Sequence, residues 1–453
     1  MHFSKLITAV IGASSAFAAA PLVPTDGKVL LGAWYDRNNS DTPSAVNARI
    51  GYKPLAFFQT DVDFSGTIKP WTSPQAVIPQ FLQQLQETGT NASAMLTVYP
   101  FQGFDGITDA QLADMADRLN TFVKAGRPVY FRFASEMNGS WFQYGQDPIG
   151  FVAAWRRCIT YWRKALGANA DKVAFIWSPN SGNGYPYPGQ PYSINTTGTD
   201  AKTLANLKVL DTNGDGKVDG KDDPYTPYYP GDEYVDWVGM SIYHYGVEWP
   251  WVDNNIPETD KFEKYLNAFP AKGDYFGYAP FYTYFSSPEG VKNAAGAVVS
   301  AGNKPLFISE TAATYHFAYV DPAKSGTPGV NPPASRLDIK QAWWRSFLNK
   351  GFLSKYPNIH AISTFEFVKD EELTWRDFTM FGAAPNPKAG TNFSAEANSV
   401  ASAFAVDAKS FDFLTWAGAS SGTAQVSPTK SSGAVQTGAG VVAAGVAALA
   451  FLL

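Results

Sequence analysis

The chain has 453 residues, with 35 basic and 40 acidic side chains and a formal net charge of −5. This balance, without a basic run, gives no electrostatic reason to expect nucleic acid or an anionic membrane as a partner. A single cysteine, Cys158, excludes a disulfide framework and is expected to be a packed structural thiol rather than a catalytic one.

The first residues are typical of a secretory signal peptide. A lysine at position 5 precedes a short apolar stretch, and residues 16–18 (Ala-Phe-Ala) fit a cleavage site. We expect residues 1–18 to be removed and the mature chain to be secreted. Five Asn-x-Ser/Thr sequons suit a secreted glycoprotein: Asn38, Asn91, Asn138, Asn195 and Asn392.

Eight apolar segments come next, and most are followed by a stretch with helical spacing of apolar residues. Strands that alternate with helices pair in parallel, and eight of them predict an α/β fold, a closed (β/α)8 TIM barrel. The expected domain, residues 19–416, is larger than a bare barrel and requires long βα-loop insertions. The expected strands are 29–34, 55–60, 93–98, 129–133, 173–177, 235–241, 306–309 and 362–367.

Two of these strands end in a glutamate. Glu136 follows the fourth strand and Glu310 follows the seventh. Because function in a TIM barrel gathers at the carboxyl ends of the strands, both side chains are expected at one barrel mouth. Such a pair, about 5 Å apart, is what retaining cleavage of a glycosidic bond requires. Arg132 could anchor both carboxylates, and Glu366 is a reserve candidate.

The segments around Glu136, Tyr243 and Glu310 resemble glycoside hydrolase family 26. That family holds many endo-β-1,4-mannanases and some β-glucan and β-1,3-xylan hydrolases, so the resemblance implies a retaining endo-hydrolase of a β-linked polysaccharide. It implies that Glu136 is the acid/base and Glu310 the nucleophile, that Tyr243 hydrogen-bonds the nucleophile, and that Trp141 lies beside the scissile sugar. One position departs from the family pattern, since Ser135 stands where a histidine is usual.

No organic cofactor is expected. Other acidic residues compete for the catalytic role, among them Asp63 and Asp236, of which Asp236 is interpreted as structural. The chain is expected to act as a monomer. The five residues expected to bind the substrate are Trp141, Tyr243, Asn138, Arg132 and Trp177.

Residues 211–222 carry the ligand spacing of an EF-hand-type calcium loop that closes with Asp rather than Glu. The alternative is a solvated Asp/Gly turn. Because the loop lies between the fifth and sixth strands, bound calcium would stiffen one wall of the cleft without taking part in the chemistry. The expected ligands are Asp211, Asn213, Asp215, the backbone carbonyl of Lys217, and Asp222.

The end of the chain has the composition of a stalk and a lipid-anchor signal. Residues 417–433 are rich in Ser, Thr, Gly and Ala and cannot form a core. Residues 434–453 combine a polar spacer with an uncharged apolar tail, which predicts a GPI anchor whose tail is removed. The protein is therefore expected at the cell surface, in contact with the membrane only through the anchor.

Two other functions fit the same sequence. One is a cell-wall remodelling transglycosylase, which surface anchoring would suit. The other is a non-catalytic glycan-binding protein on the same barrel, which Ser135 favours and the two retained glutamates oppose. Fold analogy does not choose the sugar.

Overall fold

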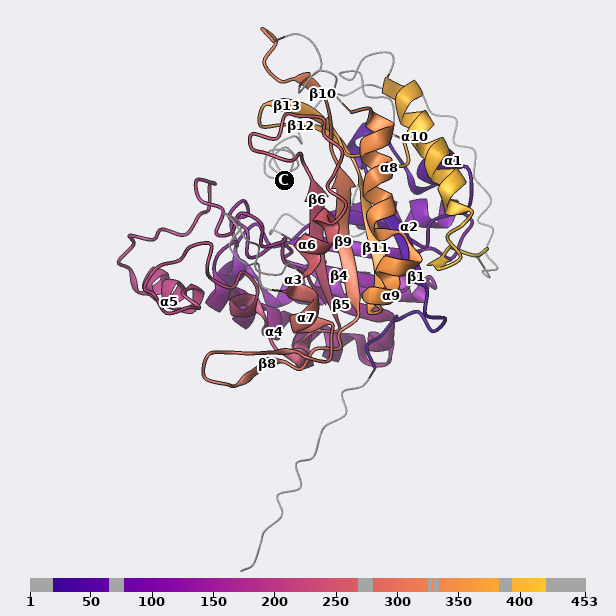
Figure 1. Ribbon diagram of the computed structural model, residues 1–453. Helices are drawn as coiled ribbons and strands as arrows, with labels where there is room; N and C mark the ends of the chain where they lie inside the picture. Colours follow the sequence, from indigo (N-terminus) through magenta and orange to yellow (C-terminus); the bar gives the residue numbers. More distant parts are fainter. Residues whose placement is uncertain are drawn as a thin grey trace, which may run out of the picture.

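The structure is a computed structural model that describes residues 19–64, 77–267, 280–324, 328, 334–382 and 393–420 (Figure 1). The expected signal peptide (1–18) and anchor signal (434–453) lie outside the described residues. The folded part extends to residue 420, beyond the expected boundary at 416, because Ala417 and Ser420 donate backbone hydrogen bonds to Pro54 and Gly89. Within the described ranges, no helix has the length and apolar character needed to cross a bilayer.

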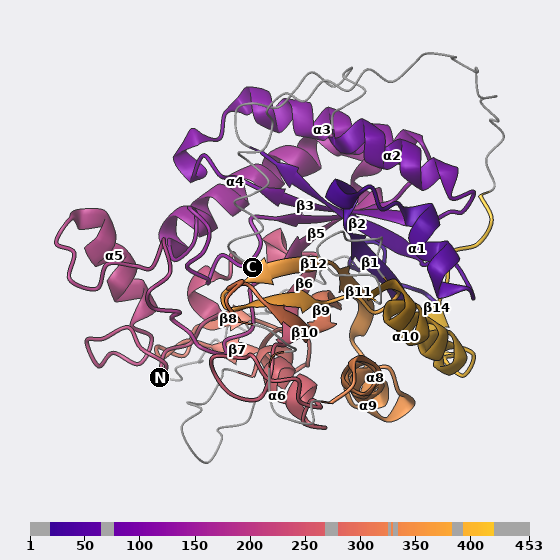
Figure 2. The ribbon, with the colours of Figure 1, turned by 90° about the horizontal axis from the view of Figure 1, so that it is seen from above.

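Eight parallel strands form a closed barrel at the centre of the molecule (Figure 2). Each pairs with the next in order, and β11 pairs with β1 to complete the ring, so the predicted TIM barrel is confirmed. A short ninth strand, β14 (Leu414–Thr415), adds to the start of β1. The barrel strands are β1 (Val29–Tyr35), β2 (Phe57–Asp63), β3 (Ser93–Tyr99), β4 (Val129–Phe133), β5 (Val173–Trp177), β6 (Trp237–His244), β9 (Leu306–Ala313) and β11 (Ile359–Glu366).

Helices surround the barrel (Figure 2). Local sequence sets where they begin: the Thr108 and Gln111 side chains form a capping box, and Asp147 caps a helix that starts with a proline. The helices are α1 (Pro43–Ile50), α2 (Val77–Glu87), α3 (Asp109–Lys124), α4 (Pro148–Leu166), α5 (Ala201–Leu210), α6 (Lys261–Asn267), α7 (Phe281–Phe285), α8 (Arg336–Phe347), α9 (Lys350–Lys355) and α10 (Phe393–Ala408).

The loops after β9 and β11 join in a small antiparallel sheet above the barrel (Figure 1). Its order is β10 (Tyr315–Tyr319), β13 (Thr374–Asp377) and β12 (Val368–Glu371), and a separate hairpin pairs β7 (Val291–Lys292) with β8 (Val298–Ser300). These elements are part of the loop insertions that the length of the chain required. The three-stranded sheet itself was not predicted.

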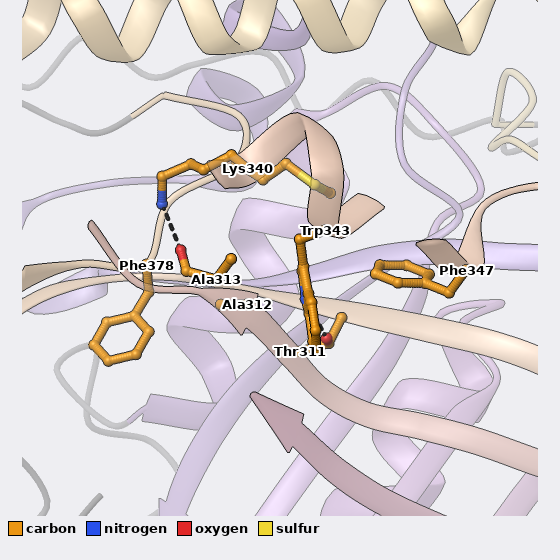
Figure 3. Close-up of a pocket in the computed structure, with 8 residues that line it drawn as sticks. Thr311, Ala312, Ala313, Lys340, Trp343, Phe347 and Phe378 are labelled. Carbon is orange, nitrogen blue, oxygen red and sulfur yellow. Dashed lines mark hydrogen bonds between the residues drawn. The ribbon is translucent and has the colours of Figure 1, made fainter. Parts of the chain in front are cut away.

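Helix α8 packs against the outer face of β9, and a small pocket lies between them (Figure 3). The Lys340 ammonium donates to the Ala313 carbonyl at 2.9 Å, and the Trp343 indole donates to Thr311 Oγ1 at 3.0 Å. These bonds fix the helix to the strand. Ala312 and Phe378 also line the pocket, and both belong to the buried cluster that contains Tyr243.

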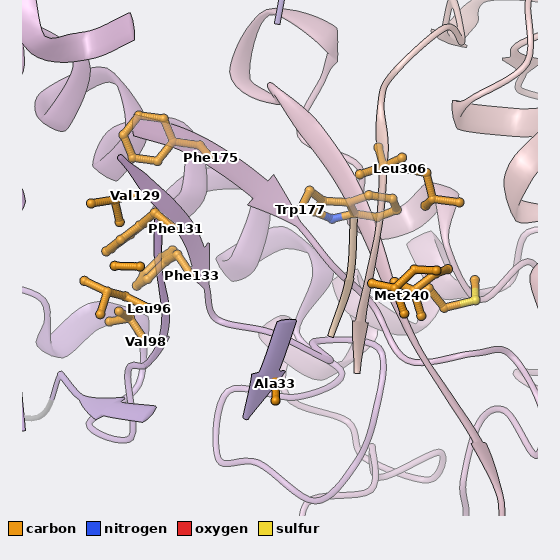
Figure 4. Close-up of a cluster of buried hydrophobic side chains, with 14 of the residues drawn as sticks. Ala33, Leu96, Val98, Val129, Phe131, Phe133, Phe175, Trp177, Met240 and Leu306 are labelled. Carbon is orange, nitrogen blue, oxygen red and sulfur yellow. The ribbon is translucent and has the colours of Figure 1, made fainter. Parts of the chain in front are cut away.

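Residues on each barrel strand alternate between the helices and the interior. The outward side chains, such as Phe131 and Trp177, form the large core beneath the helices (Figure 4). Inside, an aromatic layer includes Tyr130 and Trp237. It is closed at the amino-terminal end by the segment 20–23, whose backbone carbonyls accept hydrogen bonds from both rings. Buried polar residues of the described strands, such as Gln59, Thr97 and Arg132, lie beyond this layer toward the opposite mouth.

Candidate active site

Glu136 lies in a tight turn after β4, three residues beyond the end of the strand rather than at its end. Ala134 and Glu136 both have positive φ, 46° and 55°, a strained conformation for residues with a Cβ. The turn is held to the end of β5, because the Glu136 N–H donates to the Ser178 carbonyl at 2.8 Å. This local geometry directs the Glu136 carboxyl back over the barrel.

Glu310 lies within β9, and a bulge sets its direction. Relative to both neighbouring strands, β9 carries one extra residue between Ile308 and Thr311. Bulges re-aim side chains and are frequent beside active sites. Glu310 thus points into the barrel mouth, where it is almost completely buried.

Arg132 connects the two glutamates. This side chain is completely buried on β4. Its Nη1 donates to Glu310, and its Nη2 lies 3.8 Å from Oε1 of Glu136. Two serine hydroxyls fix the guanidinium plane, Ser178 at 3.0 Å and Ser241 at 2.9 Å. One rigid cation from β4 therefore holds both carboxylates at the mouth.

The environments of the two glutamates differ. Tyr243 donates to Oε2 of Glu310 at 2.6 Å, which together with Arg132 stabilises negative charge on that carboxylate. Glu136 accepts a hydrogen bond from the Trp141 indole at 2.9 Å, and the Ser241 hydroxyl also stabilises its charged form. Burial and the charge of Glu310 raise the pKa of Glu136 to about 7, against the opposing effect of Arg132. Glu136 is therefore suited to carry a proton.

A third carboxyl group, Asp61 on β2, lies at the same mouth and was not predicted. It accepts hydrogen bonds from the Trp34 indole at 2.8 Å and from the Tyr99 hydroxyl at 3.4 Å. Burial and the charge of Glu310 raise its pKa to about 7, although the Trp34 bond opposes this shift. The acidic residue that the sequence suggested on this strand, Asp63, is exposed.

Two expected substrate-binding residues do not reach the mouth. Trp177 faces outward from β5: it is fully buried, donates to the Tyr228 carbonyl and packs against Phe281. Asn138 is also fully buried, and its amide forms two hydrogen bonds with the backbone of Asn180, at 2.8 and 2.9 Å. Asn138 therefore joins two loops and is not available to a sugar.

The remaining acidic candidates are structural. Glu366 faces away from the mouth, and its Oε2 accepts the backbone N–H groups of Met380 and Phe381. Asp236 pairs with Arg163 at 2.7 Å, in agreement with its expected structural role. Ser135 is buried, and its hydroxyl has no hydrogen-bond partner among the residues that the structure describes.

Loop 211–222 forms a series of tight turns whose side-chain oxygens accept hydrogen bonds from its own backbone. Asp211 bonds the N–H groups of residues 215 and 216, and Asp222 bonds those of residues 212, 213 and 219. In the described part of the chain, no three His, Cys, Asp or Glu side chains gather in a way that could hold a metal ion. The calcium site therefore stays a prediction.

Comparison with known proteins agrees with the resemblance. Residues 84–215 match the model of glycosyl hydrolase family 26, which confirms the resemblance expected from the sequence and supports the expected class of enzyme, a glycoside hydrolase. The match includes Arg132, Glu136 and Trp141 and ends before Tyr243 and Glu310, which the geometry adds. No match was found among curated protein sequences.

The chain is also similar to solved structures at low sequence identity. The Bacillus subtilis mannanase man26 is 14% identical with a TM-score of 0.38, and the alignment covers 84% of this chain and 85% of that one. A modular endo-β-1,4-mannanase from Cellulomonas fimi is 15% identical with a TM-score of 0.45, over 86% of this chain and 72% of that one. A family 26 β-mannanase from Bacteroides ovatus is 13% identical with a TM-score of 0.43, over 86% and 90%.

Proposed function

We propose that this protein is a retaining endo-glycoside hydrolase that cuts a β-linked polysaccharide by double displacement. The observation that carries the proposal is the contact of one buried guanidinium, Arg132, with both Glu136 and Glu310. A shared cation supports the short separation of about 5 Å that a retaining enzyme needs. It argues against the gap of about 6.5–9.5 Å in which an inverting enzyme holds a water molecule.

In the first step the Glu310 carboxylate attacks the anomeric carbon of the sugar, and the bond to the leaving oxygen breaks. Glu136, whose pKa is raised to about 7 so that a large fraction stays protonated near neutral pH, donates its proton to that oxygen. The products are a glycosyl ester on Glu310 and a released chain end. As negative charge on Glu310 is consumed, the charge repulsion that keeps Glu136 protonated decreases.

In the second step Glu136, now ionised, removes a proton from water, whose oxygen attacks the anomeric carbon and releases Glu310. Arg132 stays in place through both steps because two serines and Glu310 hold it. Tyr243 and Arg132 together stabilise the carboxylate that leaves. Each turnover thus restores the starting protonation of both glutamates.

For the polysaccharide, we propose β-1,4-mannan first, because the family that the sequence resembles includes many endo-β-1,4-mannanases. The test is reducing-sugar release from β-1,4-mannan, mixed-linkage β-glucan and β-1,3-xylan. We expect Glu136→Gln to lower the rate on the polymer that is cut by about 10²–10⁴-fold. Glu310→Gln should also remove activity, because an amide is a poor nucleophile.

Glu366→Gln is the matched control for this test, because Glu366 is a buried glutamate outside the mouth whose pKa is also raised to about 7, chiefly by burial. It should keep near wild-type activity. Failure of the wild type to cut any polymer, with binding to one of them retained, would replace this proposal with a glycan-binding function.

A further inference from the structure

A row of aromatic rings leads from the nucleophile to the molecular surface. The ring of Tyr243, which hydrogen-bonds Glu310, lies 5.5 Å from that of Tyr245. The Tyr245 ring lies 5.8 Å from Trp251, and Trp251 lies 4.9 Å from Trp249. The first three side chains are buried or half-buried. The last, Trp249, is 67% exposed, the highest value for a large hydrophobic side chain in the described residues.

The loop that carries these tryptophans, residues 245–255, is fixed at both ends. Lys261 donates to the Gly246 carbonyl at 2.6 Å. The Asn254 side chain forms two bonds with the backbone of His316, at 2.7 and 2.8 Å, and the His316 ring contacts the Tyr245 carbonyl at 2.7 Å. These partners are themselves buried. An indole held by such a frame loses little conformational freedom when a ligand binds.

The aromatic residues that lead to Trp249 indicate which kind of ligand could pack on its exposed ring. Single exposed apolar residues are common on protein surfaces and need no partner. Trp249 differs, because it continues a ring row whose inner end touches the nucleophile. Aromatic faces pack against the C–H faces of sugar rings, while the indole edge keeps a polar N–H. A polysaccharide that reaches Glu310 would run beyond the mouth, so a further sugar of the same chain is the occupant that this position fits.

We propose that Trp249, supported by Trp251, forms a platform that binds a sugar ring of the polysaccharide remote from the bond being cut. This inference rests on the proposed glycoside hydrolase function and extends its binding site along the loop after β6. The platform contributes to capture of a long chain and not to the chemical step. Its loss should therefore raise KM and leave kcat unchanged.

The test compares Trp249→Ala, Trp249→Phe and Val406→Ala in the full protein. Val406 is a matched control, because it is an exposed apolar side chain on α10. On the polymer that the wild type cuts, Trp249→Ala should raise KM about three- to tenfold with kcat unchanged, as expected for loss of one ring contact. Trp249→Phe should recover most of this loss. On the shortest oligosaccharide of the same linkage that is cut, all three variants should match the wild type.

A polymer KM for Trp249→Ala within about twofold of the wild-type value would overturn the platform, as would an equal effect on the short oligosaccharide. A second measurement separates the platform from the catalytic proposal. Electrophoresis of the protein through a native gel containing β-1,4-mannan, mixed-linkage β-glucan or β-1,3-xylan reports binding without cleavage. Slower migration that Trp249→Ala abolishes supports the platform even if no polymer is cut, and unchanged migration of the wild type in all three gels overturns it.

Discussion

The barrel mouth and loop 211–222 both gather acidic side chains, but they stabilise them in different ways. At the mouth the partners come from distant parts of the chain: Arg132 and Glu310 are 178 residues apart, and Tyr243 and Glu310 are 67 apart. In the loop, the acids bond backbone N–H groups at most ten residues away. The two glutamates at the mouth are buried, whereas half of the loop residues are exposed.

The burial at the mouth changes the chemistry of its carboxyl groups. Burial and the charge of Glu310 raise the pKa of Glu136 and of Asp61 to about 7 at the mouth. Arg132 contacts both Glu136 and Glu310, so a substitution at either glutamate should change the electrostatic environment of the other. The hydrogen bonds of loop 211–222 are local, so a single substitution there should have a small effect on stability.

The largest effect is expected from Arg132→Met, which removes the shared cation. It leaves two buried carboxylates without their common partner, so unfolding in urea at neutral pH should show a loss of about 3–5 kcal/mol. Activity per folded molecule should also fall, because Glu310 is no longer positioned.

Arg127→Met is the matched control, since Arg127 is also buried and, in the described part of the chain, donates to the carbonyls of Ala92 and Leu85 at the other end of the strand. It should reduce stability while the folded fraction keeps its kcat. Equal loss of kcat in both variants would show that Arg132 is only structural.

The next effect concerns pH. The general acid acts while protonated, so kcat/KM should decrease about tenfold per pH unit above about 7, the pKa to which burial and Glu310 raise Glu136. The measurement is initial rate between about pH 5 and about pH 9. Asp61→Asn should retain this alkaline decrease, which would assign it to Glu136, and a flat profile up to about pH 9 would contradict the acid role.

Asp61→Asn also tests the repulsion at the mouth. The pKa of Asp61 is raised by folding, so its ionisation opposes folding as pH rises from about 4 to about 7, and the full penalty applies above that. Asn keeps the acceptor for the Trp34 indole without the charge. The variant should therefore be more stable than the wild type by up to about 4 kcal/mol at pH 8, and not at pH 4. A gain of equal size at both pH values would refute the electrostatic origin.

The smallest effect is expected in the loop. We propose that calcium binds residues 211–222, supported by the ligand spacing in the sequence. Added Ca²⁺ should raise Tm by about 3 °C and EDTA should reverse the shift, with kcat unchanged. Asp215→Asn, which keeps an acceptor for the backbone N–H of Lys217, should weaken the response. If Tm does not respond to either reagent, the loop is a self-bonded turn.

The barrel and the location of both glutamates at its mouth could be predicted from the sequence. Buried parallel strands form continuous apolar runs, and active residues follow their carboxyl ends. The sequence did not reveal which side of a strand faces inward. Trp177 was assigned to the site and Asp61 was missed for this one reason: a strand buried on both faces has no polar alternation to show its register. Contacts between loops, such as those of Asn138, depend on the assembled fold.

The central claim is that Glu136 and Glu310 act as a close pair through a covalent intermediate. The most direct test is the anomeric configuration of the first product, followed by proton NMR from the moment that the enzyme is added to the polysaccharide it cuts. Double displacement predicts that the new reducing end appears with the β configuration of the bond that was cut. Initial appearance of the α anomer would contradict the account, because inversion requires a water between the carboxylates and no bond to Glu310.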